Sequence, residues 1–167
     1  MRTEIYTLDK NDLETLRGIV PDYVVDRADV KGYFTLGAVK KGNEDEGILG
    51  VAQFYVNITP KGECFAEIIY VFVEEEYRRQ GMGTKLVERI SRVLKKSSIN
   101  TATFIIPEPI DGRLEYEVSA KEIAAFFKEC GYTNAKEERD LLITTQDEIV
   151  TDLKDRKVLR FLSLIGK

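Results

Sequence analysis

The segment at residues 63–98 constrains the fold most, because it joins an apolar run, a glycine-containing loop and a long amphipathic pattern. The run Cys64–Val73 is rich in β-branched and aromatic residues, which predicts a largely buried strand. From Thr84 onward, apolar residues recur at three- and four-residue steps, which predicts a helix with one buried face. Those apolar positions are Leu86, Val87, Ile90, Val93 and Leu94.

The loop at residues 78–83, RRQGMG, joins this strand to the helix. Glycine has no Cβ, so its backbone can approach a ligand closely. The unpaired N–H groups at a helix start favour a phosphate or pyrophosphate. A glycine pair at this place is also common in a tight turn that binds nothing, so the loop alone leaves both interpretations open. Its spacing is neither that of the phosphate loop of nucleotide hydrolases nor that of the three-glycine dinucleotide fingerprint.

The loop resembles the Arg/Gln-x-x-Gly-x-Gly/Ala signature of the GCN5-related N-acetyltransferases (GNAT family), carried here by Arg78, Gly81 and Gly83. The resemblance extends to the hydrophobic strand before the loop and to the helix after it. It implies that acetyl-coenzyme A (acetyl-CoA) is the cosubstrate and that this loop holds its pyrophosphate. The cofactor-binding residues that it implies are Arg78, Arg79, Gly81, Met82, Gly83 and Thr84, with the backbones of Val71 and Val73 pairing with the pantetheine arm and the thioester oxygen.

The resemblance also implies the fold, an α/β (α+β) architecture in a single domain over residues 1–167. Its mixed, mostly antiparallel sheet has six to seven strands and is flanked by about four helices. The residue patterns predict strands at Glu4–Leu8, Tyr33–Val39, Ile48–Val56, Cys64–Val73, Ile99–Ile106 and Leu141–Thr145. Because residues 99–106 follow the long helix directly, their strand should pair parallel with the central strand. Gly50, inside a strand pattern, predicts a bulge or a close backbone contact.

The remaining helices are predicted from caps and periodicity. Asp9 or Asn11 caps a helix whose apolar positions are Leu13, Leu16, Ile19 and Val20, and Pro21 interrupts it before a second short helix at residues 23–25. Ser119 begins a late helix that Gly131 ends. In residues 146–167, Asp147–Asp155 has a helical pattern, and Val158–Ile165 fits either a strand or a helix. This tail is either the last strand of the sheet or a C-terminal extension that packs on a neighbouring subunit.

Composition limits the partners. The chain has 167 residues, 43% of them hydrophobic, with a net charge of −4 and a pI of about 5.1. The lack of overall basic character argues against nucleic acid as the main partner. No apolar stretch has the length of a membrane span, and the first ten residues do not have the pattern of a signal peptide. Cys64 and Cys130 lack CxxC spacing, so we expect a cytoplasmic protein in which both are small buried apolar residues.

The chain contains no histidine. This removes serine–histidine triads, acid–base chemistry by histidine and most zinc sites. The acidic run Glu74-Glu75-Glu76 is the best remaining metal-binding candidate, but consecutive side chains point in different directions, so we expect a solvated turn there. No metal cofactor is predicted.

Glu67 is the predicted general base of an acetyl transfer. Removing a proton from an ammonium group needs a nearby base, and Glu67 lies inside an otherwise apolar strand, where poor solvation raises a carboxyl pKa. The segment 65–70, FAEIIY, also resembles the strand that carries the general-base glutamate in the histone-acetyltransferase branch of the family. An alternative of equal weight is a hydrogen-bonded glutamate without a chemical role.

The general acid is where the sequence departs from the family pattern. Family members often place a tyrosine four residues before the glycine that ends the late helix, and Phe127 stands there; Ala120 stands where an asparagine is common. Tyr70, Tyr116 or Tyr132 could substitute, or the thiolate leaves unassisted.

The predicted function is therefore an N-acetyltransferase that moves an acetyl group directly from acetyl-CoA to a primary amine of a small molecule or a protein. The alternative is a non-catalytic acyl-CoA-binding regulatory protein, motivated by Phe127. On the acceptor side, Asp22, Tyr23 and Asp26 either meet the substrate or only cover the sheet edge, and the latter is favoured; Glu115 and Glu117 also suit a cationic amine. A homodimer is a further expectation, and the sequence does not name the acceptor.

Overall fold

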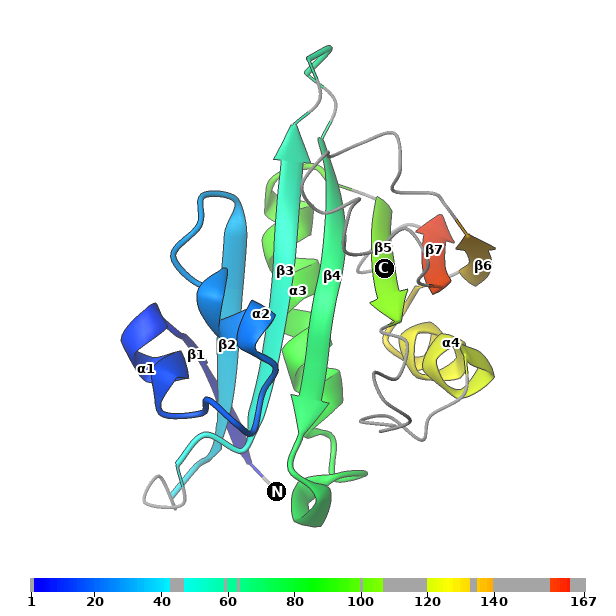
Figure 1. The fold of residues 1–167 in the computed structure, drawn as a ribbon. Coiled ribbons are helices and arrows are strands. Elements are labelled where there is room, and N and C mark those ends of the chain that lie inside the picture. Colours follow the sequence, from blue (N-terminus) through cyan, green and yellow to red (C-terminus); the bar gives the residue numbers. More distant parts are fainter. Residues whose placement is uncertain are drawn as a thin grey trace.

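A computed structural model describes residues 2–42, 47–58, 60–62, 64–99, 101–106, 120–132, 135–139 and 157–162. Its centre is a seven-stranded sheet in the order β1-β2-β3-β4-β5-β7-β6 (Figure 1). Neighbouring strands run antiparallel except β4 and β5, which are parallel. The strands are β1 (Thr3–Thr7), β2 (Tyr33–Lys40), β3 (Gly50–Ile58), β4 (Cys64–Val73), β5 (Thr101–Ile106), β6 (Ala135–Arg139) and β7 (Lys157–Leu162). The predicted sheet class is confirmed, as is the parallel crossover.

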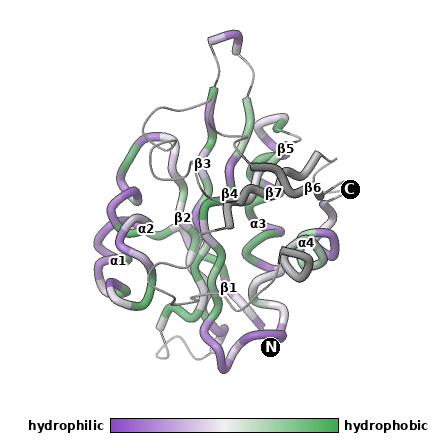
Figure 2. Tube along the Cα trace, turned by 45° about the vertical axis from the view of Figure 1, so that its right-hand side comes forward, coloured by the Kyte–Doolittle hydropathy of each residue, from purple (hydrophilic) through white to green (hydrophobic). Residues whose placement is uncertain are grey.

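Helices cover both faces of the sheet. Those of the described residues are α1 (Lys10–Glu14), α2 (Asp22–Asp26), α3 (Met82–Lys96) and α4 (Ala120–Glu129), with a 3-10 turn, η2, at Glu75–Tyr77. Figures 1 and 2 show α1 and α2 on one face and the long α3 on the other, behind β3 and β4. The two faces of the sheet are therefore covered by different helices, and β4 contributes side chains to both faces.

Each face has its own apolar core. The core under α3 contains Leu36, Ala52, Phe54, Ala66, Ile68, Leu86, Val87, Ile90, Leu94 and Tyr132, among others. The core under α1 and α2 contains Leu8, Leu13, Val20, Val24, Val25, Val51, Ile69 and Tyr70. Figure 2 shows the corresponding hydrophobic colouring along the central strands. The predicted buried face of the long helix is confirmed, with Val93 only partly buried.

The central strand Cys64–Val73 has the predicted bounds, and the long helix begins at Met82, two residues before the predicted start. Asp9 caps α1 through a capping box with Asp12. The first helix is shorter than predicted, because it ends at Glu14 and Gly18 takes a left-handed conformation at φ +94°. The second short helix is confirmed as α2.

Gly50 makes a close contact and is not the bulge. A Cβ built on it would lie 3.2 Å from Leu86 Cδ1, Met82 Sδ and the Phe72 carbonyl oxygen. The irregularity lies further along the β3–β4 ladder, where Gln53 pairs with Tyr70 and Phe54 pairs with Ile68, which leaves Ile69 as an extra residue in β4. A bulge of this kind re-aims the side chains that follow it.

The C-terminal part of the sheet decides between the strand and the helix predicted for Val158–Ile165. Gly131 ends α4 at φ +98°, as predicted, and residues Lys157–Leu162 form strand β7, not a helix. Strand β6 at Ala135–Arg139 was not predicted. The predicted cap Ser119, the predicted strand Leu141–Thr145 and the predicted helix Asp147–Asp155 lie outside the described residues.

The expectation of two buried cysteines is wrong. Cys64 is exposed and Cys130 is half-buried, and both are free thiols. Cys64 is exposed because it begins β4 beside the turn at Gly62, where the β3–β4 hairpin projects beyond the other elements (Figure 1). No helix among the described residues is long and apolar enough to cross a membrane.

Candidate active site

The parallel strands β4 and β5 separate part of the way along β4. Their pairs run from Ala66–Ala102 to Ile68–Phe104, whereas β4 continues to pair with β3 as far as Val73. Among the described residues, the β4 backbone beyond Ile68 therefore has no partner on its β5 side. Backbone N–H and C=O groups are obligatory hydrogen-bonding groups, so this opening can receive a ligand that offers amide-like partners.

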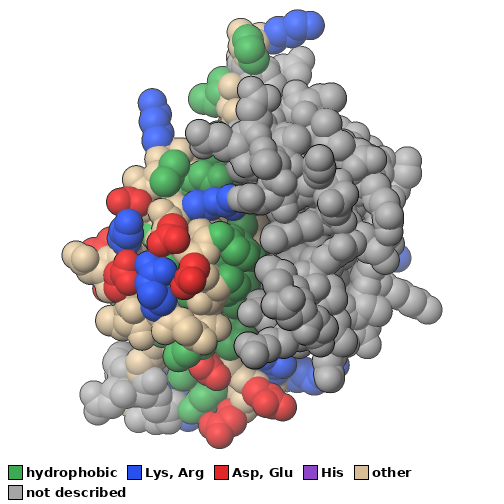
Figure 3. Space-filling view, viewed as in Figure 1, with side chains coloured by type: hydrophobic (Ala, Val, Ile, Leu, Met, Phe, Trp, Pro, Cys, Tyr) green, Lys and Arg blue, Asp and Glu red, His purple; other side chains and the backbone are tan. Residues whose placement is uncertain are grey.

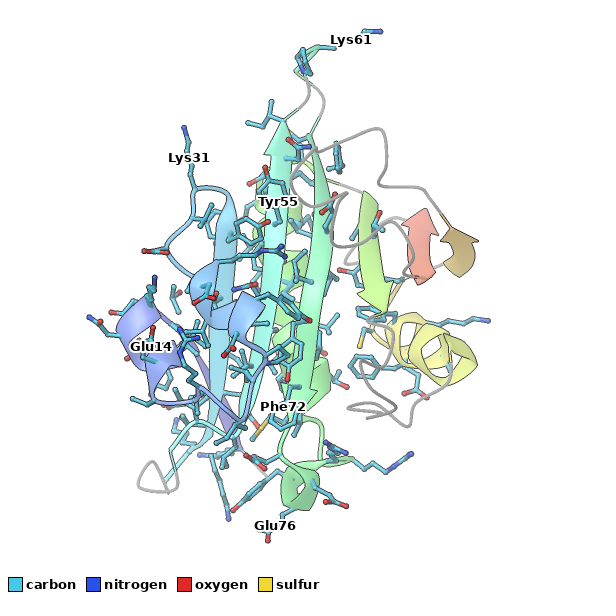
Figure 4. All side chains as sticks on the ribbon, in the orientation of Figure 1. Glu14, Lys31, Tyr55, Lys61, Phe72 and Glu76 are labelled. Carbon is cyan, nitrogen blue, oxygen red and sulfur yellow. The ribbon has the colours of Figure 1, made fainter. Side chains whose placement is uncertain are left out.

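Glu67 lies one residue before the point where the strands separate. It is directly opposite Tyr55 on β3 and Thr103 on β5, and Tyr33 on β2 is opposite Tyr55 in turn. Residues directly opposite one another on neighbouring strands share a face. The row Tyr33, Tyr55, Glu67 and Thr103 therefore crosses four strands on the face that α1 and α2 cover, and Tyr55 is labelled there in Figure 4.

The Glu67 carboxylate is buried and unpaired. The residue is 1% exposed, and neither carboxylate oxygen has a hydrogen-bond partner among the described residues. Desolvation raises its pKa from 4.5 to about 7, while the nearby positive charge of Arg27 opposes the shift. A carboxyl group with a pKa near 7 can accept and return a proton at physiological pH.

Aromatic rings and a guanidinium group surround this row. Arg27, at the end of α2, lies over the Tyr23 ring at 5.6 Å and over the Tyr33 ring at 5.8 Å. The Tyr33 and Tyr55 rings are 4.6 Å apart. These four side chains are half-buried. No sequence signal marks Arg27, Tyr33 and Tyr55, because strand register places the two tyrosines in the row of Glu67 and the position of α2 places Arg27 near it.

The loop before α3 has the backbone of an anion site. Gly81 precedes the helix at φ +88°, no side chain caps the helix, and a Cβ on Gly81 would have no atom within 4 Å. The first helical hydrogen bond runs from the Lys85 N–H to the Gly81 carbonyl at 3.0 Å. The N–H groups of Met82, Gly83 and Thr84 precede it and have no intrahelical acceptor. These features fit the pyrophosphate of acetyl-CoA.

The two arginines of the loop differ. The Nε of Arg78 donates to the Val73 carbonyl at 2.8 Å, and its guanidinium lies 5.8 Å from the Phe72 ring. Arg78 therefore folds back on the end of β4 and already occupies one backbone group predicted to meet the pantetheine arm. Arg79 is exposed and takes a left-handed conformation at φ +59°, which is uncommon for a residue with a side chain.

Gly83 has a packing role. A Cβ at Gly83 would lie 3.4 Å from Phe126 Cζ and 3.7 Å from Val73 Cγ2. Its side-chain position therefore faces α4, whereas that of Gly81 faces open space. The structure brings Gly81, Met82, Gly83 and Thr84 together at the start of α3, close in sequence to the end of β4.

Helix α4 offers no tyrosine that could act as the general acid in place of Phe127. Phe127 is 1% exposed and packs edge-on against Phe126 and Tyr132. The Tyr132 hydroxyl is 2.9 Å from the Ser91 hydroxyl on α3, and desolvation raises its pKa to about 12. Tyr132 is therefore a buried core residue on the α3 side. Tyr70 is buried on the opposite face, and Tyr116 lies outside the described residues.

Asp22 and Asp26 are bound by a neighbouring arginine. Arg17 contacts Asp22 at 3.1 Å, Asp26 at 2.9 Å and Glu14 at 2.8 Å. Figure 3 shows acidic and basic side chains gathered over α1 and α2. The favoured interpretation, in which the two aspartates cover the sheet without meeting the substrate, agrees with this arrangement.

A cavity of about 670 Å³ lies at the far end of β4. Its lining comes from the α1–α2 connection, the approach to β3 and the acidic turn, and it includes Leu16, Ile48, Glu74 and Glu76. Glu76 is labelled at this end in Figure 4. None of the predicted catalytic or cofactor-binding residues lines it. Within the described part of the chain, no group of three or more Cys, Asp or Glu residues could hold a metal ion.

The model of the acetyltransferase (GNAT) domain matches residues 38–134, which is more than half of the chain. No curated protein sequence matches the chain. Solved structures show the same fold at low identity. Arabidopsis thaliana NAA60 in complex with acetyl-CoA aligns with a TM-score of 0.67 and 12% identity, covering 99% of this chain and 100% of that chain.

Two further structures have similar scores. The ribosomal-protein-S18-alanine N-acetyltransferase from Escherichia coli has a TM-score of 0.61 and 17% identity, with 99% of this chain and 97% of that chain covered. A spermidine N-acetyltransferase SpeG chimera, from Vibrio cholerae and hSSAT, has a TM-score of 0.62 and 10% identity, with 98% and 96% covered. With the family model, the separated parallel strands and the glycine loop all in agreement, the chain belongs to the GNAT family and is an acetyl-transferring enzyme.

Proposed function

We propose that the protein transfers the acetyl group of acetyl-CoA directly to a primary amine, with Glu67 as the general base. One observation carries the proposal: a buried carboxylate with no hydrogen-bond partner among the described residues lies where β4 and β5 begin to separate. An isolated buried carboxylate is unfavourable, so its position at this opening supports a chemical role over a purely structural one.

Glu67 takes the proton that the acceptor ammonium must lose. The freed amine nitrogen attacks the thioester carbonyl carbon and forms the new C–N bond, while the carbonyl oxygen gains negative charge. Backbone N–H groups of β4 beyond Ile68, such as that of Val71, are the proposed donors to this oxygen. Collapse breaks the C–S bond and releases the coenzyme A thiolate, and the nitrogen loses its second proton to this thiolate or to solvent, which gives the neutral acetylated amine.

The start of α3 would bind the pyrophosphate. The unpaired N–H groups of Met82, Gly83 and Thr84 supply donors and a positive helix end. Arg79 adds an exposed positive charge, while Arg78 fixes the end of β4. Acetyl-CoA supplies the activated acetyl group, and these residues hold it in place.

The leaving thiolate needs no tyrosine from α4. A thiol has a pKa of about 8.5, so its thiolate is a tolerable leaving group near neutral pH. The buried Phe127 in the usual tyrosine position therefore does not exclude turnover. It is also the observation behind the second candidate, an acyl-CoA-binding protein without activity.

The acceptor should be sought among the kinds of amine named for structurally similar proteins. These are an alanine of ribosomal protein S18, spermidine and aminoglycosides. A panel of one such peptide, spermidine and one aminoglycoside samples protein and small-molecule acceptors. A cytoplasmic location, a single domain over residues 1–167 and a homodimer stay predictions.

Thermal unfolding with and without acetyl-CoA tests the cofactor site. Ligand at about 100 times its dissociation constant should stabilise the wild type by about 2.7 kcal/mol, and the double variant Arg79→Glu, Gly81→Asp should lose this gain. An amine screen with Glu67→Gln as control follows, in which the variant should be slower by roughly 10²-fold or more. Binding without turnover of any amine would favour the non-catalytic candidate, and no shift in the wild type would contradict both.

A further inference from the structure

Gln53 is a second buried group with an unpaired acceptor. Its side chain is fully buried on β3, and its Oε1 has no partner among the described residues. The only other buried side-chain oxygens of this kind in the described part of the chain are the two of Glu67. Buried polar atoms nearly always have partners, so three unpaired acceptor atoms need a donor.

The orientation of the Gln53 amide is fixed by its neighbours. The Nε2 atom lies 2.7 Å from the Val24 carbonyl and 3.1 Å from Thr35 Oγ1. A carbonyl can only accept, so the NH₂ end must face Val24, and Oε1 points elsewhere. Gln53 therefore attaches α2 to the sheet through its donors and leaves its acceptor unused.

Gln53 and Glu67 stand on the same face. Glu67 is opposite Tyr55, and Gln53 precedes Tyr55 by two residues on β3, so the two are diagonal neighbours. Diagonal pairs of this kind have Cβ atoms within roughly 7–8 Å, in reach of long side chains. The contact of Gln53 with α2 and the charge of Arg27 near Glu67 both place the pair under α2.

We propose that Gln53 Oε1 and the Glu67 carboxylate together bind the ammonium group of the acceptor, which makes Gln53 a substrate-binding residue. An ammonium group offers three N–H donors and a positive charge, which the two carboxylate oxygens and Oε1 can accept. Acceptor-only groups select N–H donors and reject a fully alkylated cation. This inference rests on the proposed function, because it places the amine beside the proposed base.

Burial orients this amine. Gln53 is fully buried and Glu67 nearly so, whereas Tyr33, Tyr55 and Arg27 are half-buried. The ammonium group of the acceptor therefore lies deepest, and the rest of the acceptor lies outward against the two tyrosines.

Wild-type protein with two matched salts gives the first test. Methylammonium chloride carries three N–H donors, and tetramethylammonium chloride carries the same charge with none. At about ten times its dissociation constant and pH 8, methylammonium should raise the unfolding midpoint by roughly 3–6 °C relative to tetramethylammonium. The side-chain amide signals of Gln53 in a ¹⁵N spectrum should shift with methylammonium only. Equal effects of the two salts would overturn the proposal and leave a bound water as the donor.

Variants separate binding from structure. Gln53→Met keeps the length of the side chain and removes the whole amide, both Oε1 and the Nε2 donors to Val24 and Thr35, whereas Thr35→Val removes only one partner of Nε2. Gln53→Met should abolish the methylammonium effect, and with any acceptor that turns over it should raise the KM for the amine at least tenfold while the KM for acetyl-CoA is unchanged. Thr35→Val should keep both values within about twofold. Equal losses in the two variants would show that Gln53 is structural and overturn the proposal.

Failure of this inference and failure of the proposed function have different signatures. If Gln53→Met does not fold, the wild-type comparison and the Gln53 amide signals decide the question. Stabilisation by acetyl-CoA with no response to methylammonium contradicts the ammonium pair alone. No response to acetyl-CoA contradicts the proposed function, whatever the amines do.

Discussion

Glu67 illustrates how burial changes a single carboxyl group. Folding raises its pKa from 4.5 to about 7 by desolvation. Between these pH values the folded chain holds a proton that the unfolded chain has released. The protonated group therefore favours folding below about pH 4.5, and this contribution is lost as the pH rises through 7.

Glu67→Gln should stabilise the protein at pH 8, because it removes a buried charge without changing the shape of the side chain. The gain in unfolding free energy should reach up to about 3 kcal/mol at pH 8 and disappear near pH 4.5. Urea unfolding at both values measures it. The exposed Glu75→Gln is the matched control and should change little. Equal stability of Glu67→Gln and wild type at pH 8 would show that Glu67 is solvated.

The same group predicts the pH dependence of activity. As the general base, Glu67 must be unprotonated, so kcat/KM should rise with pH and level off above about 7. Initial rates between pH 5.5 and 9 with one acceptor from the panel measure this. In Glu67→Gln the rise near pH 7 should be absent, and a wild-type rise centred well away from 7 would argue for another base.

Tyr132 should matter for stability and not for chemistry. Tyr132→Phe removes the buried hydrogen bond to Ser91 and should lower the unfolding free energy by about 1 kcal/mol. Ser91→Ala, its matched partner, should have a similar effect. Neither should change kcat by more than twofold. A large fall in kcat for Tyr132→Phe alone would instead assign it the role of general acid.

At the residue scale, the sequence predicts some of the site and misses the rest for a clear reason. Glu67 stands out because it is the one charged residue in an apolar strand. Gln53 has no such signal, because polar residues at alternate strand positions are usual on a solvated face. Its role depends on the register with Tyr55 and on the position of α2, both long-range properties.

At the scale of elements, two glycines at the start of α3, Gly81 and Gly83, have different structural roles. Gly81 has a left-handed backbone and open space beside it, whereas Gly83 lies in the helix against Phe126. The glycine signature predicts the loop. Packing against Phe126 explains why residue 83 is small, but no packing contact explains the glycine at position 81. The open side of Gly81 is therefore where the pyrophosphate should approach.

Gly81→Ala should destabilise the protein by about 1 kcal/mol, because an L residue at φ +88° is strained. It should also weaken acetyl-CoA binding, since its methyl group enters the open space. Gly83→Ala is the matched control and should fold normally and keep its affinity, because alanine favours the helix and 3.4 Å is an ordinary contact distance. Calorimetry measures both affinities, and the reverse order would contradict this assignment.

Element boundaries were predicted where the pattern is strong. Strand β4 and helix α3 have long apolar patterns, and their bounds agree within two residues. The predicted length of the first helix is too great, because the apolar spacing continues through the turns that follow Glu14. Strand β6, AKEER, has almost no apolar signal, and only its pairing with β7 makes it a strand.

At the scale of the whole molecule, the sheet depends on the end of the chain. Strand β7 lies between β5 and β6, and it is the only strand paired with β6 among the described residues. The sequence patterns of residues 146–167 fit either the last strand of the sheet or a C-terminal extension. The strand alternative is correct for Lys157–Leu162, and this order could not be read from local patterns because both partners are distant in sequence.

Ending the chain after Arg156 should therefore lower the unfolding midpoint strongly and abolish acetyl-CoA stabilisation, because β5 loses a neighbour and β6 loses its partner. A chain that ends after Ile165 keeps β7 and is the matched control. Thermal unfolding followed by circular dichroism measures both. Normal stability of the shorter chain would show that β7 is an accessory strand.

The position of β7 also determines when this protein can finish folding during synthesis. Strands β1 to β5 are made in the order in which they pair, but the partner of β5 on its other side is made last. Until then β5 is an unpaired edge, and such edges join other chains readily. The nascent chain is therefore most prone to aggregation in the interval between the synthesis of β5 and that of β7, and a chaperone that covers the β5 edge during this interval should raise the yield of folded protein.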